Sequence, residues 1–242
     1  YNDQYNCWVT RQYDGSRLRL PGFSHAVQLR DHQLNAIMRM IVGGNVLLAH
    51  VVGAGKTLTM VCGTMELRRL GLAKKPVHVV PNPLLSQYCA EFVRAYPGAS
   101  VLMATKDNFE KQNRREFVAK CATGDWDAIV ITHSMFERIM PDPDVAADYI
   151  ESVLAELKAT QAQPGIERSA SRAINRQIKD WEARLEKMQA LWKKDDLMLF
   201  SEVGFDYVAY DEAHVLKNLW RQSNMKAIAG LNNTDSQRSF DM

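Results

Sequence analysis

Short apolar runs recur along the chain, and stretches with helical periodicity separate them. The runs are rich in β-branched residues and lack polar alternation, which is typical of strands covered on both faces. They lie at 45–50 (NVLLAH), 76–81 (PVHVVP), 100–105 (SVLMAT), 128–133 (AIVITH) and 207–212 (YVAYDE). Helices are predicted between them at 56–70, 83–95 and 107–122.

This alternation predicts an α/β fold in which helices flank a parallel central sheet and right-handed crossovers join the strands. In open sheets of this kind, ligands bind beyond the carboxyl ends of the strands. Polar residues that follow the predicted strands are therefore the first candidates for a functional site.

The stretch from 142 to about 200 interrupts the alternation. Apolar residues recur there at spacings of four and three, which is a heptad seam, at Ile174, Ile178, Trp181, Leu185, Met188 and Trp192. A shorter stripe precedes it at Ile150, Leu154 and Leu157, and the residues QPG at 163–165 favour a turn. We therefore predict an inserted antiparallel helical (coiled-coil) hairpin, which is either a solvated insertion packed on itself or an arm that docks a partner or DNA.

Composition is that of an ordinary globular domain, because 46% of the 242 residues are apolar and 24% are charged. The formal net charge of +2 is too small to identify a nucleic-acid partner by itself. The four cysteines lie far apart without zinc-ligand spacing, so we expect a reducing, cytoplasmic setting. No apolar run reaches the roughly 18 residues of a membrane span. The chain begins without Met and stops within the pattern QRSFDM, so we expect a fragment.

A glycine-containing loop joins the first predicted strand to the first predicted helix. Its residues are Gly53, Ala54, Gly55, Lys56, Thr57 and Leu58. Glycines let successive backbone N–H groups point inward at a helix N-terminus, and this arrangement binds phosphate. Lys56 would then reach the β- and γ-phosphates of ATP, and the Thr57 hydroxyl would ligate Mg²⁺. The strict P-loop pattern expects glycine where His50 stands, and we favour a packing role for His50 over nucleotide contact.

Two adjacent carboxylates, Asp211 and Glu212, end the last predicted strand. Asp211 could hold Mg²⁺ through water, and Glu212 could orient or deprotonate the attacking water. The candidate catalytic residues are thus Lys56, Asp211 and Glu212. His214 is either a structural histidine or a coupling residue between the ATP site and a partner lobe.

The residues GAGKT and DEAH resemble the first RecA-like lobe of superfamily-2 helicases and translocases, and LRDHQ at 29–33 resembles the Q motif of the Snf-type members. The resemblance implies that Gln33 contacts the adenine of ATP. It also implies sequence-independent contacts to the backbone of double-stranded DNA in the loops after two strands. The residues at those positions are Pro81, Asn82, Thr132, His133 and Ser134.

A narrower resemblance, to phage and plasmid N6-adenine methylase–helicase polypeptides of defence or antirestriction, rests on YDGSRLRLPG, LLAHVVGAGKT, THSMFERI and KDDLMLFSEVGFDYVAYDEAH. It implies an N-terminal extension at 1–28 and a RecA-like ATPase lobe at 29–242. It also implies a second RecA-like lobe and a methylase domain as partners in the same polypeptide, and no membrane.

Two functions remain open at this point. The chain is either the ATP-binding lobe of an ATP-dependent DNA translocase, or a non-catalytic module in which nucleotide gates binding and the hairpin docks a partner. The presence of Lys56, Thr57, Asp211 and Glu212 together favours the motor. We expect the isolated lobe to be nearly inactive, because the resemblance places the transition-state arginines in the second lobe.

Overall fold

The computed structural model describes residues 11–162, 168–192 and 198–216. The predicted turn at 163–165, Cys7 and the closing pattern at 237–242 lie outside the described residues. Within those three ranges, no helix combines the length and the apolar character that crossing a bilayer requires. The chain divides into two compact units, one of residues 1–106, 123–136 and 205–213 and the other of the remainder, and each is described by itself.

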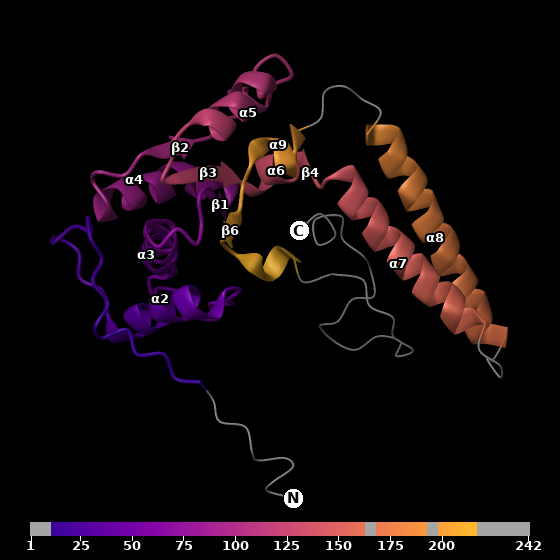
Figure 1. The fold of residues 1–242 in the computed structure, drawn as a ribbon, viewed down its shortest axis with the longest axis horizontal. Helices are drawn as coiled ribbons and strands as arrows, with labels where there is room; N and C mark the ends of the chain where they lie inside the picture. The colour runs from indigo at the N-terminus through magenta and orange to yellow at the C-terminus, as the bar shows by residue number, and fades with distance from the viewer. Residues whose placement is uncertain (1–10, 163–167, 193–197, 217–242) are drawn as a thin grey trace, which may run out of the picture. The chain divides into compact units, whose positions relative to one another are not determined.

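The first unit contains a four-stranded sheet in the order β2-β3-β1-β6, and all of its strand pairs are parallel (Figure 1). The strands are β1 (Pro76–Val80), β2 (Val101–Met103), β3 (Ala128–Thr132) and β6 (Tyr207–Tyr210). The central strands β1 and β3 are buried along their whole length, as the unbroken apolar runs predicted. The α/β fold class with its parallel sheet is therefore confirmed.

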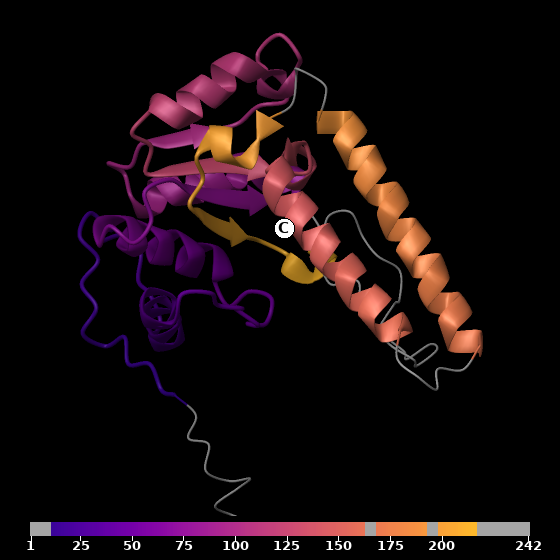
Figure 2. The same ribbon diagram turned by 45° about the vertical axis from the view of Figure 1, so that its right-hand side comes forward.

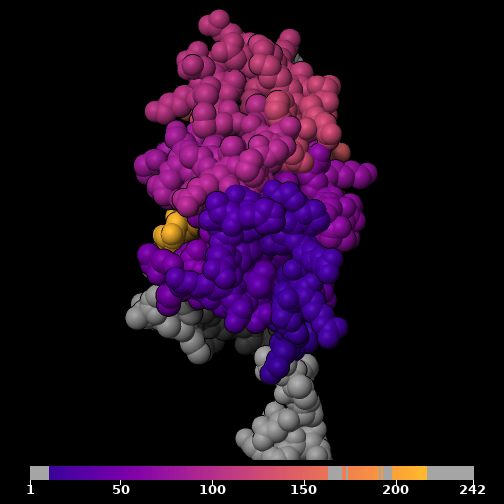
Figure 3. All heavy atoms as spheres, turned by 90° about the vertical axis from the view of Figure 1, so that its left-hand side faces the viewer, coloured from indigo at the N-terminus to yellow at the C-terminus, as the bar shows by residue number. Residues whose placement is uncertain are grey.

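Four helices of this unit pack with one another and with the sheet. They are α2 (Asp31–Gly43), α3 (Lys56–Arg69), α4 (Leu85–Ala95) after the short turn η1 (Asn82–Leu84), and α6 (His133–Phe136). Apolar side chains of α2, α3 and α4 form one core with β1 and β3, including Ile37, Val61 and Phe92. The N-terminal segment adds Leu18 and Phe23 to that core, and the indigo atoms of Figure 3, which include this segment and α2, lie in the lower half of the face shown.

A buried histidine ties this helical layer to the sheet. His78 of β1 is fully buried, with its ring nitrogens 3.0 Å from the Thr64 hydroxyl on α3 and 2.7 Å from the Tyr88 hydroxyl on α4. Burial lowers the pKa of His78 to about 3, so the imidazole stays neutral and contributes two hydrogen bonds without a charge.

The predicted strand at 45–50 is wrong. Residues 46–50 have no regular secondary structure, and β6 stands at the end of the strand order. Leu47 is 73% exposed, and the carbonyl groups of His50 and Val51 accept bonds from the Lys56 ammonium. The run is apolar enough for a strand, but strand propensity needs burial against neighbours to take effect.

The second unit contains the inserted hairpin. The helices α7 (Pro143–Gln161) and α8 (Arg168–Trp192) lie side by side in Figures 1 and 2 and run in opposite directions. Every residue of the predicted seam and of the shorter stripe belongs to one apolar cluster that these two helices form alone. The heptad prediction is thereby confirmed.

Short elements flank the hairpin. The strands β4 (Ile139–Met140) and β5 (Met198–Leu199) pair in parallel just outside its two ends, and α9 (Phe200–Val203) follows. A hydrogen bond from the Ser201 hydroxyl to the Asp142 carboxylate joins the same two segments. The unit also contains η2 (Asp107–Phe109), α5 (Arg114–Thr123) and the turn η3 (Ala213–Leu216), of which η2 and α5 divide the single helix predicted at 107–122.

Because the hairpin core is closed on itself, the α/β unit should fold without it. We predict that replacing residues 144–194 by a short Gly/Ser linker preserves a cooperative thermal transition and the far-ultraviolet signature of the sheet. A matched variant that keeps both helices but carries Trp181→Ala and Ile178→Ala should lose helix content while keeping the same transition of the α/β unit. Aggregation of the excised protein would contradict the prediction.

Candidate phosphate-binding site

Two glycines shape the loop that opens α3. Gly53 and Gly55 both have left-handed backbones, with φ of 82° and 77°, and Gly55 is the N-cap of the helix. A side chain on Gly55 would also meet the Gln33 amide nitrogen at 2.4 Å. Only glycine satisfies both constraints, so this turn requires the residue that the sequence places there.

The first turn of α2 holds this loop from one side. Gln33 is almost fully buried, and its side chain accepts the Arg30 N–H at 2.9 Å and donates to the Gly55 carbonyl at 3.1 Å. The neighbouring His32 places its Nε2 3.0 Å from the Ala54 carbonyl. Two successive carbonyl groups of the loop are thus bound by α2. Gln33 was expected from the sequence as an adenine contact, whereas the contact of His32 was not expected.

Lys56 bends back over its own loop. Its ammonium group donates to the carbonyls of His50 and Val51 at 3.2 and 3.4 Å. The His50 ring stands edge-on to the ring of His32 with centroids 5.5 Å apart, which agrees with a packing role. Thr57 and Leu58 are half-buried in the first turn of α3, where the backbone N–H groups have no partner within the helix.

The Asp211 carboxylate lies at the carboxyl end of β6. Its backbone N–H donates to the Val79 carbonyl at 2.8 Å, which extends the β1–β6 pairing by one residue. Burial raises the pKa of Asp211 and the Glu212 charge adds to this, while the Glu212 N–H bond and the charges of Lys56 and His133 oppose it. The charge of Lys56 therefore acts on Asp211, although the two residues are 155 positions apart in the sequence.

Glu212 has an unusual backbone. Its φ is 55°, the only positive φ among the described non-glycine residues, while its side chain is exposed. Such a conformation costs about 1–3 kcal/mol and is maintained by surrounding structure. Here the Glu212 N–H donates to the Asp211 carboxylate at 3.0 Å. The left-handed backbone at Glu212 ends the extended conformation that follows β6.

The predicted DNA-contact residues gather at the ends of β1 and β3. The Ser134 hydroxyl donates to the Asn82 side-chain carbonyl at 3.1 Å and lies 3.2 Å from the Thr132 hydroxyl. Asn82 and Ser134 are exposed, Pro81 is half-buried before η1, and Thr132 is only 4% exposed. Three of the five predicted residues thus form one hydrogen-bonded cluster, in which Thr132 supports Ser134 from beneath.

His133 points away from that cluster, toward the carboxylates. Its Nε2 lies 2.9 Å from the Asp211 carbonyl, and its ring stacks on Tyr210 with centroids 4.7 Å apart. It thereby joins the end of β3 to the end of β6. His214 lies exposed in η3, which belongs for the most part to the other unit.

The residues present fit a nucleotide with a divalent cation. A helix N-terminus behind a glycine turn binds phosphate, and the Lys56 ammonium is held by loop carbonyls that a phosphate could replace. Among the described side chains, no three of His, Cys, Asp or Glu gather into a metal site. Mg²⁺ commonly uses only one or two protein oxygens together with phosphates and waters, and Thr57 with Asp211 suit that pattern.

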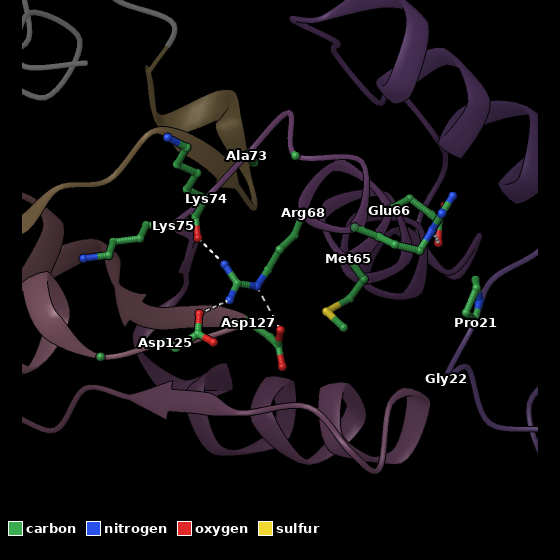
Figure 4. Close-up of a pocket in the computed structure, with 13 residues that line it drawn as sticks. Pro21, Gly22, Met65, Glu66, Arg68, Ala73, Lys74, Lys75, Asp125 and Asp127 are labelled. Carbon is green, nitrogen blue, oxygen red and sulfur yellow. Dashed lines mark hydrogen bonds and ion pairs between the residues drawn. The ribbon is translucent and has the colours of Figure 1, made fainter.

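A hollow of about 860 Å³ lies where α3 ends and β1 begins, away from these residues (Figure 4). Arg68 crosses it, with bonds to the carboxylates of Asp125 at 2.5 Å and Asp127 at 2.9 Å and to the Lys74 carbonyl. Most charged side chains that line this hollow form ion pairs with one another. We therefore assign the hollow a structural role, in which Arg68 links α3 to the segment before β3.

The raised pKa of Asp211 gives a stability prediction. The pKa of Asp211 in the native state lies above the ordinary value of 3.8, so ionisation of this carboxylate lowers the free energy of unfolding. This loss is complete at pH values above the native pKa and is absent at pH values below 3.8. We expect Asp211→Asn to raise the melting temperature at neutral pH, by about 2–4 °C for each kcal/mol gained. The gain should shrink as the pH falls toward the ordinary value.

Asp148→Asn, on the exposed face of α7, is the matched control and should leave the melting temperature unchanged at both pH values. Scanning calorimetry at two pH values measures both variants. A lower melting temperature for Asp211→Asn at neutral pH would mean that the carboxylate is a net stabiliser.

Comparison with known families finds a match. A family model described as "Probable helicase domain" matches residues 37–242, which includes the glycine loop, the sheet, the hairpin and both carboxylates. No curated protein matches the chain. Since the match covers most of its length, the chain belongs to the family of probable helicase domains.

Proposed function

We propose that this chain is the ATP-binding lobe of an ATP-dependent DNA translocase. The proposal rests on Lys56, at the N-terminus of α3 behind the glycine turn, and on Asp211, at the carboxyl end of β6, whose pKa the charge of Lys56 helps to lower. Membership of a helicase family supports nucleotide and nucleic acid as the two ligands. Clustering of a lysine and a buried carboxylate with a raised pKa is typical of functional sites.

The residues divide the chemistry between them. Backbone N–H groups from Gly53 to Leu58 and the Lys56 ammonium bind the phosphates, and Thr57 and Asp211 hold the cation. Mg²⁺, when bound, neutralises charge that develops on the phosphates. Glu212, whose carboxylate is exposed, orients or deprotonates the attacking water.

The adenine has a candidate position beside the loop. An open hollow of about 680 Å³ is lined by Tyr13, His32, Arg39 and His50 among others. Its aromatic rings suit a purine, and its lining includes His32, which binds the Ala54 carbonyl. Gln33 still has one N–H and one lone pair available, which is what pairing with an adenine edge requires.

Double-stranded DNA would contact the cluster at the ends of β1 and β3. Asn82 and Ser134 present an amide and a hydroxyl to solvent, groups that bind phosphate oxygens without reading bases. Thr132 supports Ser134, and Pro81 starts the turn that carries Asn82. The resemblance extends the proposal to a longer polypeptide with a second RecA-like lobe and a methylase domain, acting in defence or antirestriction.

Coupling between the two sites has two candidate residues. His133 connects the cluster to Asp211 by its bond to the Asp211 carbonyl, and Ser134 is the next residue in the chain. His214 is the candidate from the family resemblance. His133 is favoured because it contacts Asp211 and Tyr210 and is the sequence neighbour of Thr132 and Ser134.

The nucleotide assignment is tested by thermal shift. Mg-ATP at a hundredfold excess over its dissociation constant should stabilise the native chain by about 2.7 kcal/mol, or about 5–10 °C. Lys56→Ala should abolish this shift, whereas Lys74→Ala, which removes an exposed lysine elsewhere, should preserve it. A full shift in a folded Lys56→Ala protein would refute the assignment.

Coupling is tested by measuring ATP affinity with and without a saturating DNA duplex. We expect the affinity change that DNA causes to disappear in His133→Ala and to persist in His214→Ala, while ATP affinity without DNA changes little in either. Disappearance in His214→Ala alone would assign the coupling to that residue instead.

A further inference from the structure

A row of basic side chains marks the outer face of α8, within the half of the helix nearest its start. Arg172, Arg176 and Lys179 are all exposed and follow one another at steps of four and three. Each precedes a seam residue by two positions, so each lies about 200° around the helix from the seam. We call these three residues the basic stripe; it faces away from α7.

The distribution of charge in α8 is uneven. Residues 168–179 contain four basic residues and no acid, whereas 180–187 alternate acids and bases. Mixed charges of that second kind are expected of a helix face that only meets water. Three exposed acids of α7, Asp144, Asp148 and Glu151, lie in the first half of that helix, near the other end of the hairpin, and Glu156 lies in its second half.

The hairpin itself does not use these charges. Its cross-helix ion pair joins Lys158 to Glu182 at 3.3 Å, and its core is the apolar seam. Within the described part of the chain, no acidic side chain forms an ion pair with a member of the basic stripe. Three neighbouring cations on one face repel one another, which disfavours folding slightly unless an anion binds them.

We propose that the basic stripe binds the phosphate backbone of duplex DNA, as a contact separate from the cluster at Asn82 and Ser134. The stripe extends about 10 Å along a straight helix, and a duplex carries one negative charge per about 1.7 Å of its axis. Two of its three members are arginines, whose planar guanidinium groups bind phosphate oxygens in pairs.

An acidic protein fits this face less well. Protein interfaces gain most of their affinity from buried aromatic and aliphatic anchors. The large apolar residues that are exposed among the described side chains include Val145 and Tyr149 at the start of α7, but none from α8. A surface with charge and without apolar anchors suits a polyanion. The identification of DNA as the polyanion rests on the proposed function. The identification of the binding surface rests on the hairpin alone.

The test uses the whole chain without nucleotide. A triple variant with Arg172→Gln, Arg176→Gln and Lys179→Gln is titrated with a short fluorescent duplex between about 50 and 200 mM salt. Losing three phosphate contacts, at about 0.9 each, should reduce the slope of log affinity against log salt by about 2–3. Affinity at the lower salt concentration should fall roughly tenfold or more.

A matched triple variant removes the same charge elsewhere, with Arg17→Gln, Arg19→Gln and Lys106→Gln, all exposed. It should keep most of the affinity and slope of the parent. Circular dichroism checks that α8 stays helical, and a variant with Arg172→Lys and Arg176→Lys, which keeps both charges but loses the paired bonds, should keep the salt slope of the parent and bind more tightly than the Gln triple. An equal loss in both Gln triples would mean that only net charge matters, which overturns the proposal.

Two further results would also overturn it. One is an unchanged slope in the stripe variant. The other is that a labelled acidic polypeptide binds the parent but not the stripe variant, while the duplex binds both equally. That result would identify a protein partner. The thermal shift by Mg-ATP should be the same in the stripe variant and the parent, so failure of the nucleotide assignment would be seen separately.

Discussion

The pairing of β1 with β6 is the constraint on which the candidate site depends. Val79 lies opposite Tyr210, and the Asp211 N–H bonds to the Val79 carbonyl one step further along. Because β1 is also paired with β3, the same central strand fixes the ends of both neighbours. The carbonyl of Asp211 is then in place to accept the bond from His133, which follows β3. Three segments distant in sequence meet because one buried strand lies between two others.

This arrangement is locally costly. A carboxylate loses hydration, a non-glycine residue adopts a left-handed backbone, and two glycines occupy conformations that other residues avoid. Proteins retain such features where function requires them and compensate with a well-packed body. The compensation here includes β1 and β3, buried along their whole length, and the neutral His78, which joins two helices to the sheet.

The sequence patterns predicted those elements that depend mainly on the local order of apolar and polar residues. Unbroken apolar runs at β1 and β3 identified buried strands, and the seam from Ile174 to Met188 identified the hairpin core. The run at 45–50 has the same composition, but pairing depends on a neighbour that composition does not reveal. The loop, Asp211, Asn82 and His133 were recognisable from motifs, whereas the bonds that His32 and His133 form to backbone carbonyls were not predicted. Any residue offers a carbonyl, so such contacts leave no signature in the sequence.

The hairpin is also long compared with the short strands at its base. Twenty-five residues of α8 extend for about 37 Å, and the two-residue strands β4 and β5 join the chain just outside its ends. A rotation of only about 10° at that narrow base would move the far end by about 6 Å, close to two nucleotide steps of 3.4 Å along a strand. The length of the helix thus turns a small change of angle into a displacement on the scale of the DNA repeat.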